Sequence, residues 1–207
     1  MPDFDLEDKY DGLVAGVDEA GRGPWVGPVV AGCVAFLNRN VDERLLKELN
    51  DSKKLSKKKR EMLYDLLQIE AEKGNILIGI GEASAREIDD INILQASFLA
   101  MKRALNKACG QKPSMLLIDG NREPKDFECS VKAVVKGDAK SYSISAASVL
   151  AKVYRDRLME KMAVTYPGYG FEKNAGYGTK AHIDGLKKFG ITPEHRRSYA
   201  PIKEFLK

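Results

Sequence analysis

Carboxylates at the ends of apolar segments are the residues of this chain best suited to chemistry. Asp18 and Glu19 directly follow the apolar segment 13–17 and lead into a glycine-rich turn. Acidic oxygens bind hard divalent cations such as Mg²⁺. Neighbouring side chains of a strand point to opposite faces, so both acids can serve one metal site only if the backbone turns there. Gly21 and Gly23 permit that turn and let main-chain N–H groups approach a ligand closely.

Two further acids stand at the same kind of position. Asp119 follows the apolar run 115–118, and Asp138 follows 131–135 after a Lys-Gly step. Strand ends that open into glycine-bearing turns are where α/β sheets usually bind ligands. Four carboxylates held together repel one another unless cations neutralise them, so such a cluster implies metal. Two metals about 4 Å apart can activate a water and stabilise a leaving oxygen in phosphoryl chemistry.

Competing sites are weakly supported by the sequence. The alternative for the Asp18 and Glu19 pair alone is a surface turn with solvated acids, because acids are common near turns. His182 and His195 have no carboxylate-rich motif beside them, so we expect each to be structural or on the surface. The three cysteines are widely spaced without a Cys-x-x-Cys pair, which argues against disulfides or zinc and predicts core positions. Phosphate loops of the Walker A and Gly-x-Gly-x-x-Gly kinds are absent from the sequence.

Size and charge bound the class of protein. The chain has 207 residues, of which 43% are hydrophobic, enough for one well-packed domain. Its formal net charge is only +4, so a nucleic-acid surface must come from local Lys and Arg clusters. Such clusters occur at 52–60, 152–157 and 187–197. The N-terminus is acidic where a signal peptide is basic, and no apolar run approaches the ~18 residues of a membrane span. We therefore expect a cytoplasmic protein without a membrane partner.

The segments that must position these acids alternate between strand and helix patterns. Strands are expected at 13–17, 26–37, 76–80, 115–118 and 131–135, the first two as an antiparallel pair. Helices are expected at 56–69, 93–108, 141–165 and 179–189, the first with Ser56 as its N-cap. This order predicts an α/β fold with a mixed sheet and helices on its faces. We assign 1–165 to a catalytic body and 166–207 to a small C-terminal helical portion packed on the same domain.

Five motifs follow one another along the chain. They are Asp18-Glu-Ala-Gly-Arg-Gly-Pro-x-x-Gly-Pro28, Asp51-Ser-Lys-Lys-Leu55, Ile118-Asp-Gly-Asn121, Gly137-Asp138 with the helical run 144–156, and Gly176-Tyr-Gly-Thr179. Together they resemble the ribonuclease HII family over nearly the whole chain. The resemblance implies a ribonuclease H-like fold, with a central mixed five-stranded sheet flanked by helices and a C-terminal helical extension. The Gly-Arg-Gly turn differs from that of the sister family, ribonuclease HIII.

Two positions depart from the family pattern. Ser145 stands where the family usually has Ala, and Ala175 where Lys commonly precedes Gly-Tyr-Gly. Neither position is expected to touch a ligand directly. The loss of a Lys at 175 would slightly weaken a phosphate contact.

The resemblance implies a metal-dependent endoribonuclease. Such an enzyme hydrolyses the RNA strand of RNA–DNA hybrids and nicks duplex DNA 5′ of a single embedded ribonucleotide, leaving 3′-hydroxyl and 5′-phosphate ends. The implied partners are these hybrids and ribonucleotide-containing duplexes, and the implied setting is DNA replication and ribonucleotide excision repair, with the protein a monomer. Two divalent ions, Mg²⁺ or Mn²⁺, are implied to bind four acids, with the first of them bridging: Asp18, Glu19, Asp119 and Asp138.

The same resemblance implies the substrate-binding residues. Gly21, Arg22 and Gly23 match the element that reads the 2′-hydroxyl, the group that distinguishes a ribonucleotide from its neighbours, through main-chain groups. Tyr177 matches the tyrosine that packs on the sugar of the adjacent deoxynucleotide. Backbone phosphates are implied to be held by Ser52, Lys53 and Lys54.

Several alternatives stay open at this point. The residues Lys57–Arg60 form either a phosphate contact or a solvated helix face, and Asp156 is either a supporting acid near the site or a salt-bridge partner of Arg155 or of neighbours of Arg157. A different carboxylate-metal nuclease or a transposase-like phosphoryl transferase would share the fold. A silent hybrid-binding module is a third possibility. Four intact acids argue against a pure binder, because anions near phosphates oppose binding.

Overall fold

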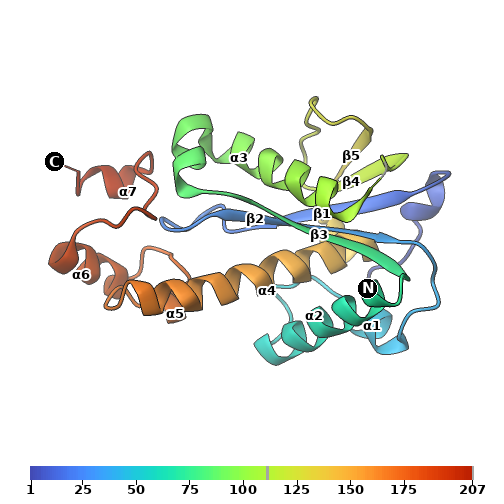
Figure 1. Cartoon of the computed structure of the whole chain (residues 1–207), viewed down its shortest axis with the longest axis horizontal. Coiled ribbons are helices and arrows are strands. Elements are labelled where there is room, and N and C mark those ends of the chain that lie inside the picture. The colour runs from blue at the N-terminus through green and yellow to red at the C-terminus, as the bar shows by residue number, and fades with distance from the viewer. Residues whose placement is uncertain (111, 207) are drawn as a thin grey trace.

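One mixed sheet forms the centre of the molecule. The computed structural model describes residues 1–110 and 112–206. Within them, five strands lie in the order β3-β2-β1-β4-β5 (Figure 1). These strands are β1 (Val14–Ala20), β2 (Val29–Phe36), β3 (Ile76–Ala83), β4 (Met115–Asp119) and β5 (Ser130–Val134). The β1–β2 and β2–β3 pairs are antiparallel, whereas β1–β4 and β4–β5 are parallel. The predicted mixed five-stranded sheet is confirmed.

Helices cover both faces of the sheet. The helix α3 (Ala85–Ala108) lies on one face, while α4 (Tyr142–Thr165) lies on the other with α1 (Glu43–Glu48) and α2 (Lys57–Glu72) beside it (Figure 1). The helices α5 (Phe171–Asn174), α6 (Lys180–Phe189) and α7 (Ala200–Lys203) lie at one end of the sheet (Figure 1). The helical elements are η1 (Glu7–Lys9), α1 (Glu43–Glu48), α2 (Lys57–Glu72), α3 (Ala85–Ala108), η2 (Gly137–Ala139), α4 (Tyr142–Thr165), α5 (Phe171–Asn174), α6 (Lys180–Phe189) and α7 (Ala200–Lys203). Ser56 caps α2 as predicted, since its side chain accepts a hydrogen bond from the N–H of Lys59.

The first half of α4 packs closely on β1 and β2. A Cβ atom added to Gly16 would lie 2.4 Å from the backbone nitrogen of Ile144, and one added to Gly32 would lie 2.3 Å from the carbonyl oxygen of Ala147. Glycine in the strands and a helix start rich in Ala and Ser allow this approach. The consequence is that η2, immediately before α4, lies at the carboxyl ends of β1 and β4.

Hydrogen bonds to the N-terminal part of the chain stabilise the start of α4. The buried carboxylate of Glu7 accepts hydrogen bonds from the Ser141 hydroxyl at 2.6 Å and from the Ser143 N–H at 3.0 Å. Ser141 is the N-cap of α4 and accepts a bond from the N–H of Ile144. A negative charge at a helix N-terminus is stabilising, because the free N–H groups there carry partial positive charge.

The structure corrects some predicted boundaries. The helix expected at 93–108 continues a helical turn that begins at Ala85, with a break at Asn92, whose φ is 66°. Ser84 and Glu87 form a capping box there, a signal already present in the sequence. The strand expected at 26–37 begins only at Val29. The short helices α1, α5 and α7 were not predicted, because four to six residues give too little periodicity to detect.

The C-terminal residues share a hydrophobic core with the body. Tyr169, Phe171 and Leu186 are buried against Val26 and Met159, which precede residue 165. The assignment of 1–165 and 166–207 to separate portions stays a prediction, and Lys207 lies outside the described residues. In the described part of the chain, every helix is too short or too polar to cross a lipid bilayer.

Candidate active site

Three of the four predicted acids lie on neighbouring strands. The strand β1 continues to Ala20, so Asp18 and Glu19 pair with Gly32 and Ala31 of β2. The strand expected at 13–17 is longer than predicted, because hydrogen bonding to β2 keeps the backbone extended through Asp18 and Glu19, and the turn at Gly21 and Gly23 begins only after Ala20. The last pair between β1 and β4 joins Val17 to Ile118, which places Asp18 beside Asp119 at the carboxyl ends of two parallel strands.

The fourth acid is carried by η2. Asp138 lies in the turn between β5 and α4 and is 9% exposed. The same turn orients Asp119, since the N–H of Gly137 donates to Asp119 Oδ1 at 2.7 Å. The Glu19 N–H donates to Asp18 Oδ1 at 2.7 Å. Each of these two aspartates therefore has one oxygen fixed by the backbone and a second oxygen available to a ligand.

The electrostatics of the acids favour a cation. Burial, followed by the charges of Glu19, Asp119 and Asp138, raises the pKa of Asp18 well above its usual value. Burial and the charge of Asp119 also raise the pKa of Asp138. A bound cation reverses these effects, because it attracts every carboxylate in the group. The carboxylate oxygens are also the donor atoms that Mg²⁺ and Mn²⁺ prefer.

The side chains as placed do not complete a coordination shell. Among residues 1–110 and 112–206, no three His, Cys, Asp or Glu side chains are close enough together to hold one metal ion. The strand register and the hydrogen bond from Gly137 to Asp119 nevertheless bring the acids to the same edge of the sheet. The four acids therefore share one edge of the sheet and one electrostatic environment, and their donor chemistry fits divalent metal.

Arg22 connects the acids to the glycine turn. Its Nη1 lies 3.1 Å from Oε1 of Glu19, and this ion pair lowers the pKa of Glu19 while burial raises it further than the pair lowers it. A small hollow of about 60 Å³ opens beside the pair and is also lined by Asp119, Asn121 and Arg122. Two of the four acids, Glu19 and Asp119, thus line a hollow that Arg22 of the turn also borders.

The turn and Tyr177 come together although 154 residues separate Gly23 from Tyr177 in sequence. A Cβ atom on Gly23 would lie 3.3 Å from a ring carbon of Tyr177, whose side chain is 51% exposed. Gly21 has a φ of +95°, and a Cβ atom there would lie 2.0 Å from Nε of Arg155. Gly21 is therefore required by its backbone conformation and by Arg155, whereas a side chain at Gly23 would need the Tyr177 ring to shift by a few tenths of an ångström.

The loop 51–55 brings a fifth acid to the site. Asp51 raises the pKa of Asp138, and Lys53 lowers it, so both side chains lie near the fourth acid. We missed Asp51, although it opens one of the five motifs. An Asp side chain that accepts a hydrogen bond from the backbone N–H two residues later is typical of a turn. Here Asp51 Oδ1 accepts from the Lys53 N–H at 2.9 Å. Lys53 and Lys54 are exposed, whereas Ser52 is 6% exposed.

The open alternatives for the neighbouring basic residues are resolved in part. Arg60 is not a solvated side chain, because its Nη1 donates to the carbonyl oxygens of Ser52 at 3.1 Å and Leu55 at 2.6 Å. Lys57 and Lys59 remain exposed and form ion pairs with Glu160 and Glu48.

Asp156 forms salt bridges, but not with the expected partners. It pairs with Lys152 at 2.7 Å and with Arg60 at 3.7 Å. Arg155 instead donates to backbone carbonyl groups, and Arg157 pairs with Glu61.

Two basic residues that looked available for nucleic acid are buried. Arg155 is 2% exposed and Arg196 is 0% exposed. The side chain of Arg196 donates to the carbonyl oxygens of Gly21 at 2.6 Å and Arg22 at 2.9 Å. No pattern in the sequence distinguishes these arginines from surface charges, because their partners are backbone atoms of distant segments.

The histidines and cysteines are mostly interior. His182 and His195 are buried and face each other, which confirms the structural role and excludes the surface. Cys33 and Cys109 are buried as predicted, and Cys129 is partly buried.

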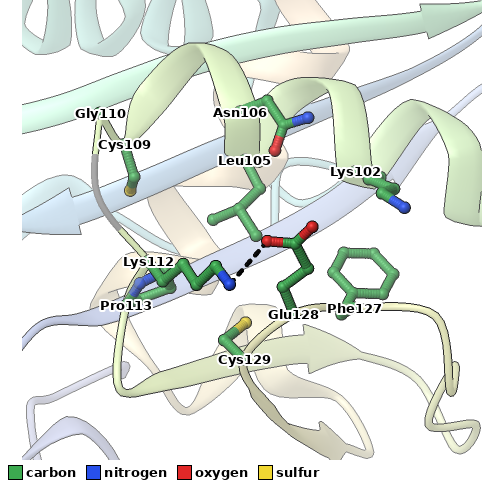
Figure 2. A pocket seen from close by; sticks show the side chains of 10 residues that line it. All are labelled: Lys102, Leu105, Asn106, Cys109, Gly110, Lys112, Pro113, Phe127, Glu128 and Cys129. Carbon is green, nitrogen blue, oxygen red and sulfur yellow. Dashed lines mark ion pairs between the residues drawn. The ribbon is translucent and has the colours of Figure 1, made fainter.

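Two larger hollows lie away from the acids. One of about 860 Å³ lies between α3 and the segment 122–127. Figure 2 shows a second, of about 450 Å³, where Lys112 and Glu128 form an ion pair at 2.8 Å near Cys109 and Cys129. No predicted site residue lines either hollow, so size alone would have pointed to the wrong place.

Solved structures with this fold define the class of protein. The chain matches the ribonuclease H2 from Pyrococcus horikoshii OT3 with a TM-score of 0.73 and 32% identity, over 93% of this chain and 96% of the other. It matches the Archaeoglobus fulgidus protein of a PCNA:RNase HII complex with a TM-score of 0.69 and 25% identity, over 90% and 95%. The fold is therefore the ribonuclease H fold, in the form found in type 2 enzymes.

Sequence comparison gives the family. A model described as Ribonuclease HII matches residues 15–202, which include all four acids. A ribonuclease HII of Paramagnetospirillum magneticum is 51% identical over 206 residues, covering 100% of this chain and 99% of the relative. The chain belongs to the ribonuclease HII family and has the hydrolase activity of a type 2 ribonuclease H. This finding decides against the transposase-like and binding-only alternatives.

Proposed function

We propose that this hydrolase is a metal-dependent endonuclease with two related substrates. It cleaves the RNA strand of RNA–DNA hybrids and nicks duplex DNA on the 5′ side of a single embedded ribonucleotide, leaving 3′-hydroxyl and 5′-phosphate ends. The observation that supports this most is the ion pair between Arg22 and Glu19. It joins the acid group to the Gly21–Gly23 turn, so a cleavage site and a ribose-reading element lie side by side.

The four acids are assigned as ligands of two divalent ions, Mg²⁺ or Mn²⁺. Asp18 interacts with each of the other three and is the natural shared ligand. Bound divalent ions supply a more acidic water and stabilise charge on the departing 3′-oxygen. The protein contributes by fixing its carboxylates before substrate arrives: backbone N–H groups hold one oxygen each of Asp18 and Asp119. Fixed ligands of this kind need little reorganisation during the reaction.

Substrate recognition is assigned to the residues around this group. Main-chain groups of Gly21, Arg22 and Gly23 would read the 2′-hydroxyl, and the half-exposed ring of Tyr177 would pack on the sugar of the next nucleotide. Phosphates are assigned to the loop that lies near Asp138, through Ser52, Lys53 and Lys54. The two lysines have exposed side chains for this, whereas Ser52 is buried and would act mainly through the loop backbone.

The setting of the reaction is also part of the proposal. The protein is proposed to act as a monomer. The free cysteines Cys33, Cys109 and Cys129 fit a reducing compartment such as the cytoplasm. Ribonucleotides in duplex DNA arise during replication, so the proposed role is in DNA replication and ribonucleotide excision repair.

A cleavage assay tests the proposal. Three duplexes of one sequence should be used, with no ribonucleotide, one, and a run of several, each with Mg²⁺, with Mn²⁺ and with a chelator. We expect no cleavage of the first, one nick 5′ of the ribonucleotide in the second, and cuts within the run in the third, all dependent on metal. Cleavage that persists in chelator, or a cut on the 3′ side of the ribonucleotide, would contradict the proposal.

A further inference from the structure

The segment 194–199 lies alongside the loop that connects β1 and β2. The N–H of Arg196 donates to the Trp25 carbonyl at 2.8 Å, and the N–H of Gly27 donates to the Glu194 carbonyl at 2.9 Å. Val26 and His195 form the antiparallel bridge between these bonds. This pairing holds the C-terminal segment against the loop in one register.

Arg196 binds the inner side of the Gly21–Gly23 turn. Its guanidinium donates to the carbonyl oxygens of Gly21, Arg22 and Gly27 at 2.6, 2.9 and 3.0 Å. The Tyr199 hydroxyl also donates to the Arg22 carbonyl, at 2.6 Å, and accepts from Arg196 at 3.0 Å. A rigid fork of five N–H donors can fix several carbonyls at once, which a Lys ammonium on a flexible stem does less well.

The direction of these carbonyls determines where the turn's N–H groups point. In a trans peptide the C=O of one residue and the N–H of the next lie in one plane and point in opposite directions. The Gly21 and Arg22 carbonyls point toward Arg196, so the N–H groups of Arg22 and Gly23 point away from it. Within residues 1–110 and 112–206, neither N–H donates a hydrogen bond. Both remain available to a ligand on the outer side of the turn.

His195 is connected to the second recognition element. The Thr192 N–H donates to His195 Nδ1 at 2.8 Å, so the ring proton of His195 lies on Nε2. That proton faces His182 Nε2 at 3.1 Å, which leaves the His182 proton on Nδ1 to donate to the Tyr177 carbonyl at 3.0 Å. Burial lowers the pKa of both rings, which keeps them neutral as this chain of hydrogen bonds requires.

We propose that His195 and Arg196 are positioning residues that hold the two recognition elements at a fixed separation. Arg196, with Tyr199, orients the Gly21–Gly23 turn, and His195 orients Tyr177 through His182. The inference rests on the proposed function, in which the turn reads the ribonucleotide and Tyr177 reads its neighbour. Those two nucleotides are adjacent in the strand, so the two elements must keep one spacing, and adjacent residues of one segment provide it.

The charge of Arg196 supports this role over simple core packing. None of its hydrogen-bond partners within residues 1–110 and 112–206 is a carboxylate. Burying an uncompensated charge opposes folding, and an apolar side chain of similar volume is often the more stable choice. The guanidinium can bind two carbonyl groups of the turn at once, which an apolar side chain cannot do. This geometry is the benefit that offsets the cost of burying the charge.

The test compares two tyrosines in a cleavage-blocked background. Tyr199→Phe removes the hydroxyl that binds Arg22, and Tyr169→Phe removes a hydroxyl that donates to the Gly190 carbonyl at 2.8 Å, away from the turn. Each change is made in Asp138→Asn protein with metal present. The measurement is the ratio of affinities for a duplex with one ribonucleotide and for the same duplex made only of DNA. We expect Tyr199→Phe to lower this ratio about fivefold, as one lost hydrogen bond predicts, and Tyr169→Phe to leave it unchanged.

Two further variants sharpen the test in Asp138-intact protein. Arg196→Lys keeps the charge but cannot reach both carbonyls, so it should lower cleavage of both substrates; if it does not fold, Tyr199→Phe alone decides. His195→Asn should slow cleavage of a single ribonucleotide more than cleavage of a long hybrid, because only the junction requires Tyr177.

Each outcome bears on the proposal. An unchanged affinity ratio in Tyr199→Phe, with the wild-type preference for the ribonucleotide intact, overturns the inference and leaves the proposed function standing. A parent protein without any preference overturns both. Equal loss of the ratio in Tyr199→Phe and Tyr169→Phe shows a general effect on folding and also contradicts the positioning role.

Discussion

Two regions of the molecule have opposite electrostatics. One is the acid edge, formed by the carboxylates of Asp18, Glu19, Asp119 and Asp138, and the other is the support of the Gly21–Gly23 turn, formed by buried arginines. At the edge, burial and then neighbouring carboxylates raise the pKa values of Asp18, Glu19 and Asp138, and the carboxylate oxygens fit divalent cations. At the support, the buried cations Arg155 and Arg196 bind neutral carbonyl groups. The first region gathers like charges, whereas each buried charge of the second has hydrogen-bond partners. The chemical step is thus assigned to the region where like charges gather. The positioning of substrate is assigned to the region where each buried charge has hydrogen-bond partners.

The largest effect should come from removing one charge at the acid edge. Asp138→Asn keeps the size of the side chain but weakens a metal ligand, and we expect turnover to fall by more than about a hundredfold, the upper end seen for residues that only support ligands. Binding of duplex should be largely retained. Single-turnover cleavage with Mg²⁺ measures this, with the exposed Asp184→Asn as the matched control. Near wild-type turnover would remove Asp138 from the ligand set.

Lowering the pH should destabilise the C-terminal region at pH values where most carboxylates are still ionised. Burial lowers the pKa of His195 to about 4, so between pH 6.5 and 4 the unfolded chain binds a proton that the folded chain does not. Stability therefore falls as pH decreases through that window, by up to about 3 kcal/mol from this group. Urea unfolding at several pH values measures it. His195→Asn should be less stable at pH 7 but show a flatter profile; an equally steep profile would show that other groups titrate.

Tyr177→Ala should separate the two substrates. The ring is half-exposed against Gly23, so its loss removes a contact to substrate more than packing of the core. An aromatic contact to a nucleotide is worth about 1–3 kcal/mol, so cleavage of a single ribonucleotide should fall about tenfold to a hundredfold. Cleavage of a long hybrid should fall less, and relative rates on the two duplexes measure the difference. Equal losses together with a lower melting temperature would show that Tyr177 supports the fold instead.

Ser145→Ala should give a small gain in stability. The Ser145 hydroxyl is buried and has no hydrogen-bond partner within the described residues. Its removal should stabilise the protein by about 1 kcal/mol, because a buried polar group without a partner costs free energy. Ser143→Ala is the matched control and should destabilise, since its hydroxyl donates to the buried Glu7. Chemical denaturation compares both, and a loss in Ser145→Ala would mean that its hydroxyl is satisfied in solution.

The four acids could be predicted from sequence, whereas the residues that support the Gly21–Gly23 turn could not. Asp18, Asp119 and Asp138 were found because acids that end apolar strands are a local pattern, and the five motifs placed the chain in its family. The sheet was found for the same reason, since each strand has its own apolar run. Asp51 was present in a motif, but no role was assigned to it.

Arg196 and His195 show the limit of sequence reasoning. Their partners, the Gly21 carbonyl and His182, are determined by tertiary contacts over 175 and 13 residues. In sequence, Arg196 stands beside Arg197 in a basic run and resembles a surface charge. The kink at Asn92 and the short helices were missed because backbone conformation there depends on capping and packing and not on periodicity.

The central claim is that the carboxylates of the acid edge repel one another and bind divalent cations. Thermal unfolding with and without Mn²⁺ tests it most directly. The melting temperature of the wild type should rise as Mn²⁺ is added, since a ligand bound only to the folded state stabilises it. Asp18→Asn should melt at least about 2 °C higher than the wild type without metal, because it removes a buried repelling charge, and should lose most of the Mn²⁺ response. A wild type indifferent to Mn²⁺, together with an Asp18→Asn variant that melts lower, would contradict the account.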